Sequence, residues 1–227
     1  ILNDWAGYPG FEVDEEAIYL TANMLELNED NTPSRIPFRL WIVEKANFYA
    51  GNRAVVNVFA PPVGFGTFMP AEVRNAAGAG PGIGTYLVKY DGLSVGGSQF
   101  IRVVRINNPL GSPTFVVEDI NIGAPDKIEF AVLPDAPQLG TTKLIEVNDR
   151  RALDAVWQDN SLWLTTTIVD LNGQTAAYWV KLDTSSVVNS GSGTGLITVA
   201  DQGVIGGEDI ATNTFTSFPA IAINTKN

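Results

Sequence analysis

The chain has 227 residues and a formal net charge of −11, whereas a nucleic-acid or anionic-membrane partner would require a basic face. It contains neither cysteine nor histidine, which excludes disulfides, thiol catalysis, Ser-His-Asp triads and His-ligated zinc from these residues. No apolar run reaches the roughly 18 residues that a transmembrane helix needs.

The first group of elements lies in the N-terminal quarter. Apolar residues alternate at period 2 over residues 18–24, which predicts a strand, although a helix can be drawn through the same stretch. Residues 39–43 and 54–59 predict two more short strands. Between them, residues 44–51 predict one helical turn that ends at a glycine cap.

The same kind of short apolar run recurs along the rest of the chain, with Gly, Asn and Pro clusters between the runs. These patterns predict strands at 85–90, 100–106, 114–117, 153–157, 161–165, 177–181 and 196–199. No long helical pattern intervenes, so the fold class is all-β.

Internal repetition favours a propeller over a sandwich. Three segments share one pattern, in which an aromatic residue or Met is followed by Pro, a small residue and then an alternating strand: 8–14, 69–75 and 218–224. Segment 151–157 is a version without proline. The spacing is about 70 residues per repeat, which is longer than the ~40–50 of short-loop propellers. We therefore expect an all-β β-propeller fragment of about three four-stranded antiparallel blades plus the first strand of a fourth.

The expected blades cover approximately residues 5–62, 63–126 and 140–206, and the next blade starts within 213–227. Aromatic residues at strand centres are expected to pack between blades; they are Trp41, Tyr86, Trp163 and Trp179. Three blades and one strand cannot close a ring and would leave apolar faces and strand edges exposed. We expect a longer protein, or other copies of the chain, to complete it.

Several stretches resemble a large group of bacterial exported proteins that are mostly uncharacterised and look like propellers. The resemblance is carried by GYPGFEVDEEAIYLTANM, LWIVEKANFYAG and, most specifically, PDAPQLGTTKLIEVNDRRALDAVWQDNSLWLTTT at residues 134–167. It implies a propeller fold and a secreted or cell-surface location in a bacterium. It implies little about activity.

Three candidate ligand-binding residues lie just before an expected inner strand, where propellers usually bind ligands. Asp149, Arg150 and Arg151 are adjacent, and the arginines could hold a carboxylate or a sugar acid through bidentate hydrogen bonds. The favoured alternative is an internal ion pair with Asp149, Asp154 or a neighbouring blade.

The loop before this stretch adds two further candidates. Asp135 and Gln138 lie in segment 134–140, which could line the same pocket but also fits an ordinary rigid turn.

Two other loops are candidates for a metal site. Asp170–Gly173 has the start of a calcium loop without its later ligands, and residues 26–31 form an acidic loop. A hairpin turn and a solvated loop are the favoured interpretations, so no cofactor is expected, with calcium the one possible ion.

No catalytic residues can be selected from the spacing of the carboxylates, and the Asp-box motif of sialidase-like propellers is absent from the sequence. We expect an exported or cell-surface propeller that acts as a binding or scaffolding module for a glycan, a protein or other copies of itself. One alternative is a carbohydrate-active propeller, either sialidase-like or a carboxylate-pair hydrolase. Another alternative is a structural subunit of an extracellular assembly.

Overall fold

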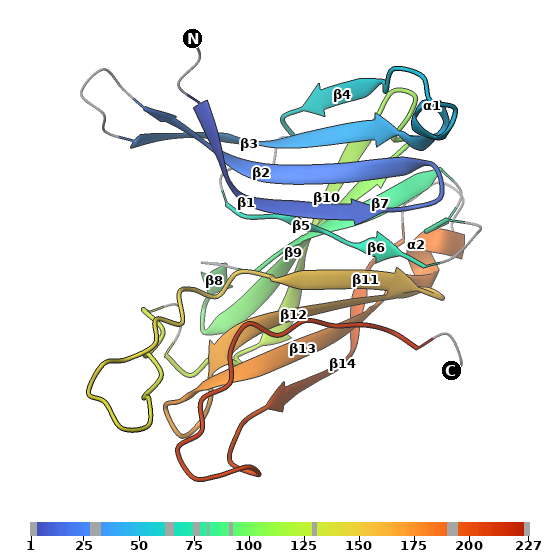
Figure 1. Cartoon of the computed structure of the whole chain (residues 1–227). Coiled ribbons are helices and arrows are strands. Elements are labelled where there is room, and N and C mark those ends of the chain that lie inside the picture. Colours follow the sequence, from blue (N-terminus) through green and yellow to red (C-terminus); the bar gives the residue numbers. More distant parts are fainter. Residues whose placement is uncertain are drawn as a thin grey trace. The chain divides into compact units, whose positions relative to one another are not determined.

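The computed structural model describes residues 4–27, 33–61, 66–74, 78–80, 82–90, 93–128, 131–189 and 195–224 (Figure 1). Strands dominate these residues, and the two helices have one turn or little more. In chain order the elements are β1 (Asp4–Val13), β2 (Ala17–Leu27), β3 (Pro33–Glu44), α1 (Lys45–Tyr49), β4 (Val56–Phe59), β5 (Met69–Pro70), β6 (Glu72–Val73), β7 (Ile83–Lys89), β8 (Ser94–Val95), β9 (Ser98–Asn107), β10 (Thr114–Gly123), β11 (Asp154–Gln158), β12 (Ser161–Val169), β13 (Thr175–Asp183), α2 (Ser185–Asn189) and β14 (Thr198–Ile205).

The strands form three sheets whose orders follow the chain closely. The first is β1-β2-β3-β4, the second is β10-β9-β7-β5 with β8 paired to β9, and the third is β14-β13-β12-β11-β6. Antiparallel neighbours joined by short connections give this sequential order. The all-β expectation is therefore confirmed, while the arrangement of the sheets as propeller blades stays a prediction.

The chain divides into two compact units, and each is described by itself. Unit 1 contains Ile1–Lys89, Val103–Glu118 and Trp157–Asp159, and unit 2 contains Tyr90–Arg102, Asp119–Val156 and Asn160–Asn227. The expected blade boundaries are not tested by this division and stay a prediction.

Unit 1 has its core on one face of the first sheet. Tyr19 pairs with Ile42 and Thr21 pairs with Leu40, so these four side chains share that face. They are almost fully buried, and the core continues through residues of later strands. Its buried apolar members are Ala17, Tyr19, Phe38, Leu40, Ile42, Phe68, Leu87, Val104 and Ile106.

Unit 2 is organised around the hairpin of β12 and β13. The register pairs Leu162 with Leu182 and Leu164 with Val180, and all four side chains are 0% exposed. Asp170 closes the hairpin turn, since its carboxylate accepts the N–H groups of Asn172 at 2.8 Å and Gln174 at 3.0 Å. The hairpin interpretation of Asp170–Gly173 is confirmed.

The remaining local predictions agree with the structure in most places. The alternating stretch 18–24 belongs to strand β2, so the helix alternative is wrong. The helical turn is α1, and Gly51 follows it with a positive φ of 70°, a conformation that glycine adopts without strain. The two-residue strands β5 and β6 lie within segment 69–75, where an alternating strand was expected, whereas no sequence pattern indicated β8, because two residues carry no periodicity.

The prediction that a strand begins within 213–227 is wrong for the described residues of this segment. Residues 215–224 form no strand, and 225–227 lie outside the described residues. This segment forms no backbone ladder: bonds to side chains of β11 and β12 hold it, together with one backbone bond from the Thr216 N–H to the Thr175 carbonyl at 3.0 Å. Thr167 Oγ1 accepts the Phe218 N–H at 3.2 Å, Thr165 Oγ1 donates to the Pro219 carbonyl at 3.1 Å, and Asp154 Oδ2 accepts the Ile221 N–H at 2.9 Å.

Candidate functional site

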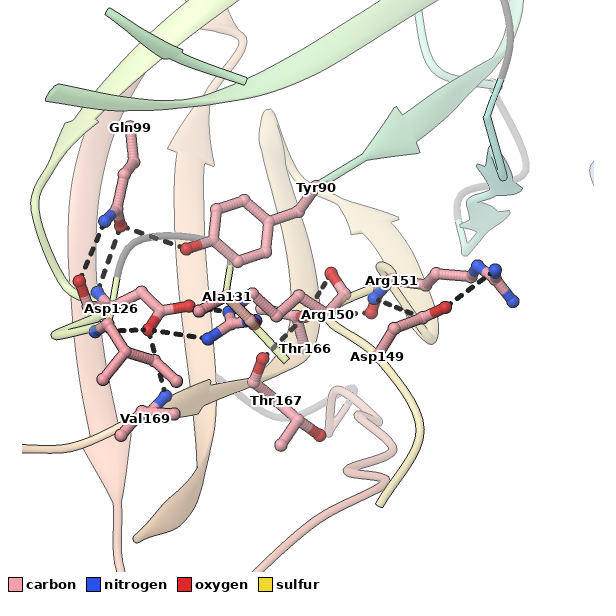
Figure 2. A network of polar contacts seen from close by, with 11 residues as sticks. Tyr90, Gln99, Asp126, Ala131, Asp149, Arg150, Arg151, Thr166, Thr167 and Val169 are labelled. Atoms are coloured by element: carbon pink, nitrogen blue, oxygen red, sulfur yellow. Dashed lines mark hydrogen bonds and ion pairs between the residues drawn. The ribbon is translucent and has the colours of Figure 1, made fainter. Parts of the chain in front are cut away.

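Arg150, the central residue of the expected ligand site, is buried in unit 2. Its side chain is 5% exposed. Nε donates to Asp126 Oδ2, Nη2 donates to Asp126 Oδ1 at 3.2 Å, and Nη1 donates to the Ala131 carbonyl (Figure 2). The edge of a guanidinium that recognises carboxylates carries two parallel donors, and here Asp126 occupies both of them. Arg150 thus makes an internal ion pair, as in the alternative interpretation, although its partner is Asp126.

Asp126 is the acceptor at the centre of this network. Its Oδ1 also accepts the N–H groups of Ile128 and Val169, both at 3.3 Å. Its own N–H donates to Gln99 Oε1 at 3.1 Å, and its carbonyl accepts Gln99 Nε2 at 2.9 Å. Tyr90 donates its hydroxyl to the same Gln99 Oε1 at 3.1 Å. A buried charge is tolerated when it is paired and hydrogen-bonded, and this carboxylate is both.

Two tyrosines close this polar region. The ring centroids of Tyr90 and Tyr178 lie 6.4 Å apart, and the Tyr178 hydroxyl donates to Gln202 Oε1. Burial raises the pKa of Tyr90 well above its usual value, and the nearby charge of Asp126 raises it further. Burial also raises the pKa of Tyr178. A raised pKa favours the protonated hydroxyl, and both hydroxyls donate a hydrogen bond, to Gln99 and to Gln202.

Asp149 and Arg151 form a second, more exposed ion pair. Arg151 Nη2 lies 2.7 Å from Asp149 Oδ2, and the side chains are 19% and 41% exposed. Figure 2 shows the side chains of Arg150 and Arg151 leaving the backbone in opposite directions, and Thr166 Oγ1 donates to both of their carbonyls. The adjacent arginines therefore do not converge on one ligand position.

Asp135 and Gln138 lie in the long loop that precedes this stretch, drawn in yellow in Figure 1. Both side chains are exposed. The loop is closed by an antiparallel bridge between Ala136 and Ile145, with hydrogen bonds of 2.9 and 2.8 Å, and Gln138 Nε2 donates to the Lys143 carbonyl at 3.2 Å. These contacts agree with the rigid-turn interpretation, and a ligand-binding role of the five candidates stays a prediction.

A hollow of about 290 Å³ in unit 1 is a site that sequence reasoning missed. Three segments line it: the β1–β2 turn at 14–16, glycines before and at the start of β7, and the β9–β10 turn at 108–110. The Asn108 N–H donates to the Gly82 carbonyl at 2.6 Å, which fastens the last two segments together.

Asp14 fixes the β1–β2 turn that forms one wall of the hollow. Its Oδ1 accepts the N–H groups of Glu16 at 2.7 Å and Ala17 at 2.6 Å, and its Oδ2 accepts the Tyr19 hydroxyl at 2.6 Å. Asp14 is buried, whereas Glu15 and Glu16 are exposed. Burial, followed by the charge of Asp14, raises the pKa of Tyr19. The carboxylates of Glu15 and Glu16 are thus the charged groups that this wall offers to a ligand.

One sequence signal could have indicated the hollow. Glycines recur at 78, 80, 82 and 84, and the first three have positive φ values of 73°, 128° and 71°. At Gly84 an added Cβ would lie 2.2 Å from the Tyr19 hydroxyl and 2.6 Å from Pro109 of the β9–β10 turn, so a larger residue would collide with both. The other two segments of the hollow lie about 25 and 65 residues from these glycines in the sequence. The periodicities of helices and strands do not connect segments at such distances.

Within the described ranges, no group of three or more acidic side chains has an arrangement that could hold a metal ion. The acidic loop 26–31 lies mostly outside the described residues, as 28–31 are not covered. Calcium binding stays untested. In the part of the chain that the structure covers, no helix is long and apolar enough to cross a membrane.

No protein-family model matches this chain, and no curated protein matches it in sequence. The resemblance to exported propeller-like proteins therefore stays a prediction.

Proposed function

We propose that this chain belongs to an exported or cell-surface β-propeller that works as a binding module without a catalytic centre in these residues. The observation that carries the proposal is the hollow in unit 1, a concave site between three loops of an all-β scaffold. Small-molecule sites are typically concave and hold a few polar groups, and the volume of this one is just below their roughly 300–1,000 Å³ range.

The chemistry of the hollow selects the ligand. Glu15 and Glu16 contribute exposed carboxylates, which accept hydrogen bonds and repel anions. The glycine backbone permits close approach to a ligand because no side chains project from it. A molecule of about one sugar ring with several donors fits these properties, and a cationic amino sugar fits them better than an acidic sugar.

Calorimetric titration with three related sugars tests this proposal. We expect glucosamine, which is cationic, to bind more tightly than methyl glucoside, and glucuronate to bind least. The double variant Glu15→Gln/Glu16→Gln should weaken glucosamine binding about tenfold, or about 1.4 kcal/mol, because charge-assisted hydrogen bonds are lost. The double variant Glu146→Gln/Asp209→Asn, at two exposed positions of unit 2, is the charge-matched control. The proposal fails if none of the sugars binds, or if the Glu15→Gln/Glu16→Gln variant binds glucosamine as the wild type does.

A second candidate function, that of a subunit in an extracellular assembly, is supported by a different observation. The first sheet has apolar side chains on the face opposite its core, and several of them are strongly exposed: Phe11 is 58%, Val56 is 50% and Val58 is 54% exposed. Exposed apolar patches of this kind mark interaction surfaces in soluble proteins.

A further inference from the structure

Two carboxylates of unit 2 are brought together by one glutamine. Gln174, at the end of the β12–β13 turn, donates its backbone N–H to Asp170 Oδ1 at 3.0 Å. Its side-chain Nε2 donates to Glu208 Oε1 at 2.8 Å, in the loop that follows β14. The same loop passes beside Asp170, since a Cβ added at Gly206 would lie 3.9 Å from Asp170 Oδ2. The two acidic side chains therefore belong to one cluster.

Each carboxylate uses one oxygen for the local structure and leaves the other oxygen available. Asp170 Oδ1 accepts the N–H groups that close the hairpin turn, whereas Oδ2 has only a 3.5 Å contact with Asn172 Nδ2. Glu208 Oε1 accepts Gln174 Nε2 and the Asn213 N–H at 2.9 Å. Among the described residues, neither carboxylate forms an ion pair with Lys or Arg. Neighbouring negative charges repel each other, so a cation that contacts both carboxylates would be stabilised.

Gln174 itself supplies the observation that points to a bound ion. The residue is only 6% exposed, and its Oε1 is buried without a hydrogen-bond partner in the part of the chain that the structure describes. Oε1 belongs to the amide that contacts Glu208, so it lies beside that carboxylate. Rotating the amide by half a turn would not satisfy Oε1, because it would then face Glu208 Oε1, which is also an acceptor. Buried amide oxygens almost always have a partner, and a cation is the partner that also suits both carboxylates.

We propose that this cluster binds one Ca²⁺ ion through Asp170 Oδ2, Gln174 Oε1 and Glu208 Oε2. All three ligands are oxygens, which suits a hard cation. Ca²⁺ accepts carboxylate and amide oxygens in irregular arrangements of about 6–8 ligands, whereas Mg²⁺ requires near-ideal octahedral geometry. Glu208 is exposed, so water can complete the coordination shell. The hairpin turn is compatible with the ion, because Asp170 uses Oδ1 for the turn and Oδ2 for the ion.

The ligand set predicts weak binding. Only two of the three ligands are charged, and sites with few charged ligands bind Ca²⁺ with a Kd of about 10⁻⁴–10⁻³ M. The site lies in unit 2 and includes no residue of the hollow in unit 1, so it does not depend on the proposed sugar binding.

Calorimetric titration with calcium chloride tests the proposal. The chain is first freed of divalent ions, and the ionic strength is held constant because salt screens exposed charges. We expect saturable binding of one Ca²⁺ per chain, with Mg²⁺ binding about tenfold more weakly. Glu208→Gln removes a charged ligand but keeps an acceptor for the Asn213 N–H, and it should weaken Ca²⁺ binding about tenfold. The control Asp209→Asn makes the same change of charge at the next residue, which is also exposed, and should bind Ca²⁺ as the wild type does.

Gln174→Glu distinguishes an ion site from a glutamine that only lacks a hydrogen bond. The variant replaces Oε1 by a third charged ligand, and the affinity of oxygen sites for Ca²⁺ depends on the number of charged ligands. It should bind Ca²⁺ about tenfold more tightly than the wild type does. Added Ca²⁺ should therefore raise the thermal unfolding midpoint of the variant more than that of the wild type.

Four results would overturn the proposal. They are the absence of saturable Ca²⁺ binding, equally tight binding of Mg²⁺, equal affinities of Glu208→Gln and Asp209→Asn, and a folded Gln174→Glu that binds no more tightly than the wild type. If circular dichroism shows that Gln174→Glu does not fold, the comparison of Glu208→Gln with Asp209→Asn decides alone. Sugar binding is measured separately, so the two proposals can fail independently.

Discussion

The buried ion pair of unit 2 makes the sharpest stability prediction. Replacing Arg150 by Met keeps much of the apolar volume of the side chain but removes its three hydrogen bonds. Asp126, whose side chain is 0% exposed, then retains only the N–H groups of Ile128 and Val169, each at 3.3 Å. Breaking a buried pair in this way costs about 3–5 kcal/mol of unfolding free energy, because it leaves an uncompensated buried charge.

The neighbouring pair provides the matched control. Arg151→Met removes the ion pair with Asp149, whose side chain is 41% exposed, and exposed pairs contribute only about 0–1 kcal/mol. The double variant Arg150→Met/Asp126→Leu should recover part of the loss, since an apolar pair can replace a buried ionic pair. Recovery should be incomplete because the N–H groups that Asp126 accepts lose their partner.

Urea unfolding followed by tryptophan fluorescence measures all three variants against the wild type. The midpoint should fall far more for Arg150→Met than for Arg151→Met, with similar slopes. Equal losses in the two single variants would refute the structural role of Arg150, as would a double variant less stable than Arg150→Met alone.

Two more predictions follow from buried polar groups. Burial raises the pKa values of three tyrosines, Tyr19, Tyr90 and Tyr178. Above pH about 10 the unfolded state therefore loses protons that the folded state keeps. The free energy of unfolding should keep its full value below this pH and fall above it. Absorbance at 295 nm should show these three ionising only together with unfolding, and ionisation before unfolding would contradict their burial. Asp14→Ala should cost about 2–3 kcal/mol in urea unfolding, because the Ala17 N–H and the Tyr19 hydroxyl lose their acceptor. Asp14→Asn, which keeps one acceptor oxygen, should cost less, and an equal cost would argue against this account.

Local patterns in the sequence determined most of the strands. Period-2 alternation at 18–24 and the apolar runs at 100–106 and 161–165 lie within β2, β9 and β12, because a half-buried strand needs alternating side chains wherever it occurs. The glycine cap at Gly51 is equally local, since a positive φ after a helical turn suits glycine. Such features depend on neighbouring residues alone, so they could be read without tertiary structure.

Only the tertiary structure decided which groups the polar side chains contact. The adjacent arginines looked alike in the sequence, yet Arg150 pairs with Asp126, 24 residues away, while Arg151 pairs with Asp149, two residues away. The hollow in unit 1 likewise unites three segments that no repeat or motif connects. Residues 218–224 carry a strand pattern but form no strand, and hydrogen bonds to the side chains of Asp154, Thr165 and Thr167 hold them instead. Composition and periodicity determine which elements form, whereas long-range hydrogen bonds and burial determine which polar side chains remain available to a ligand.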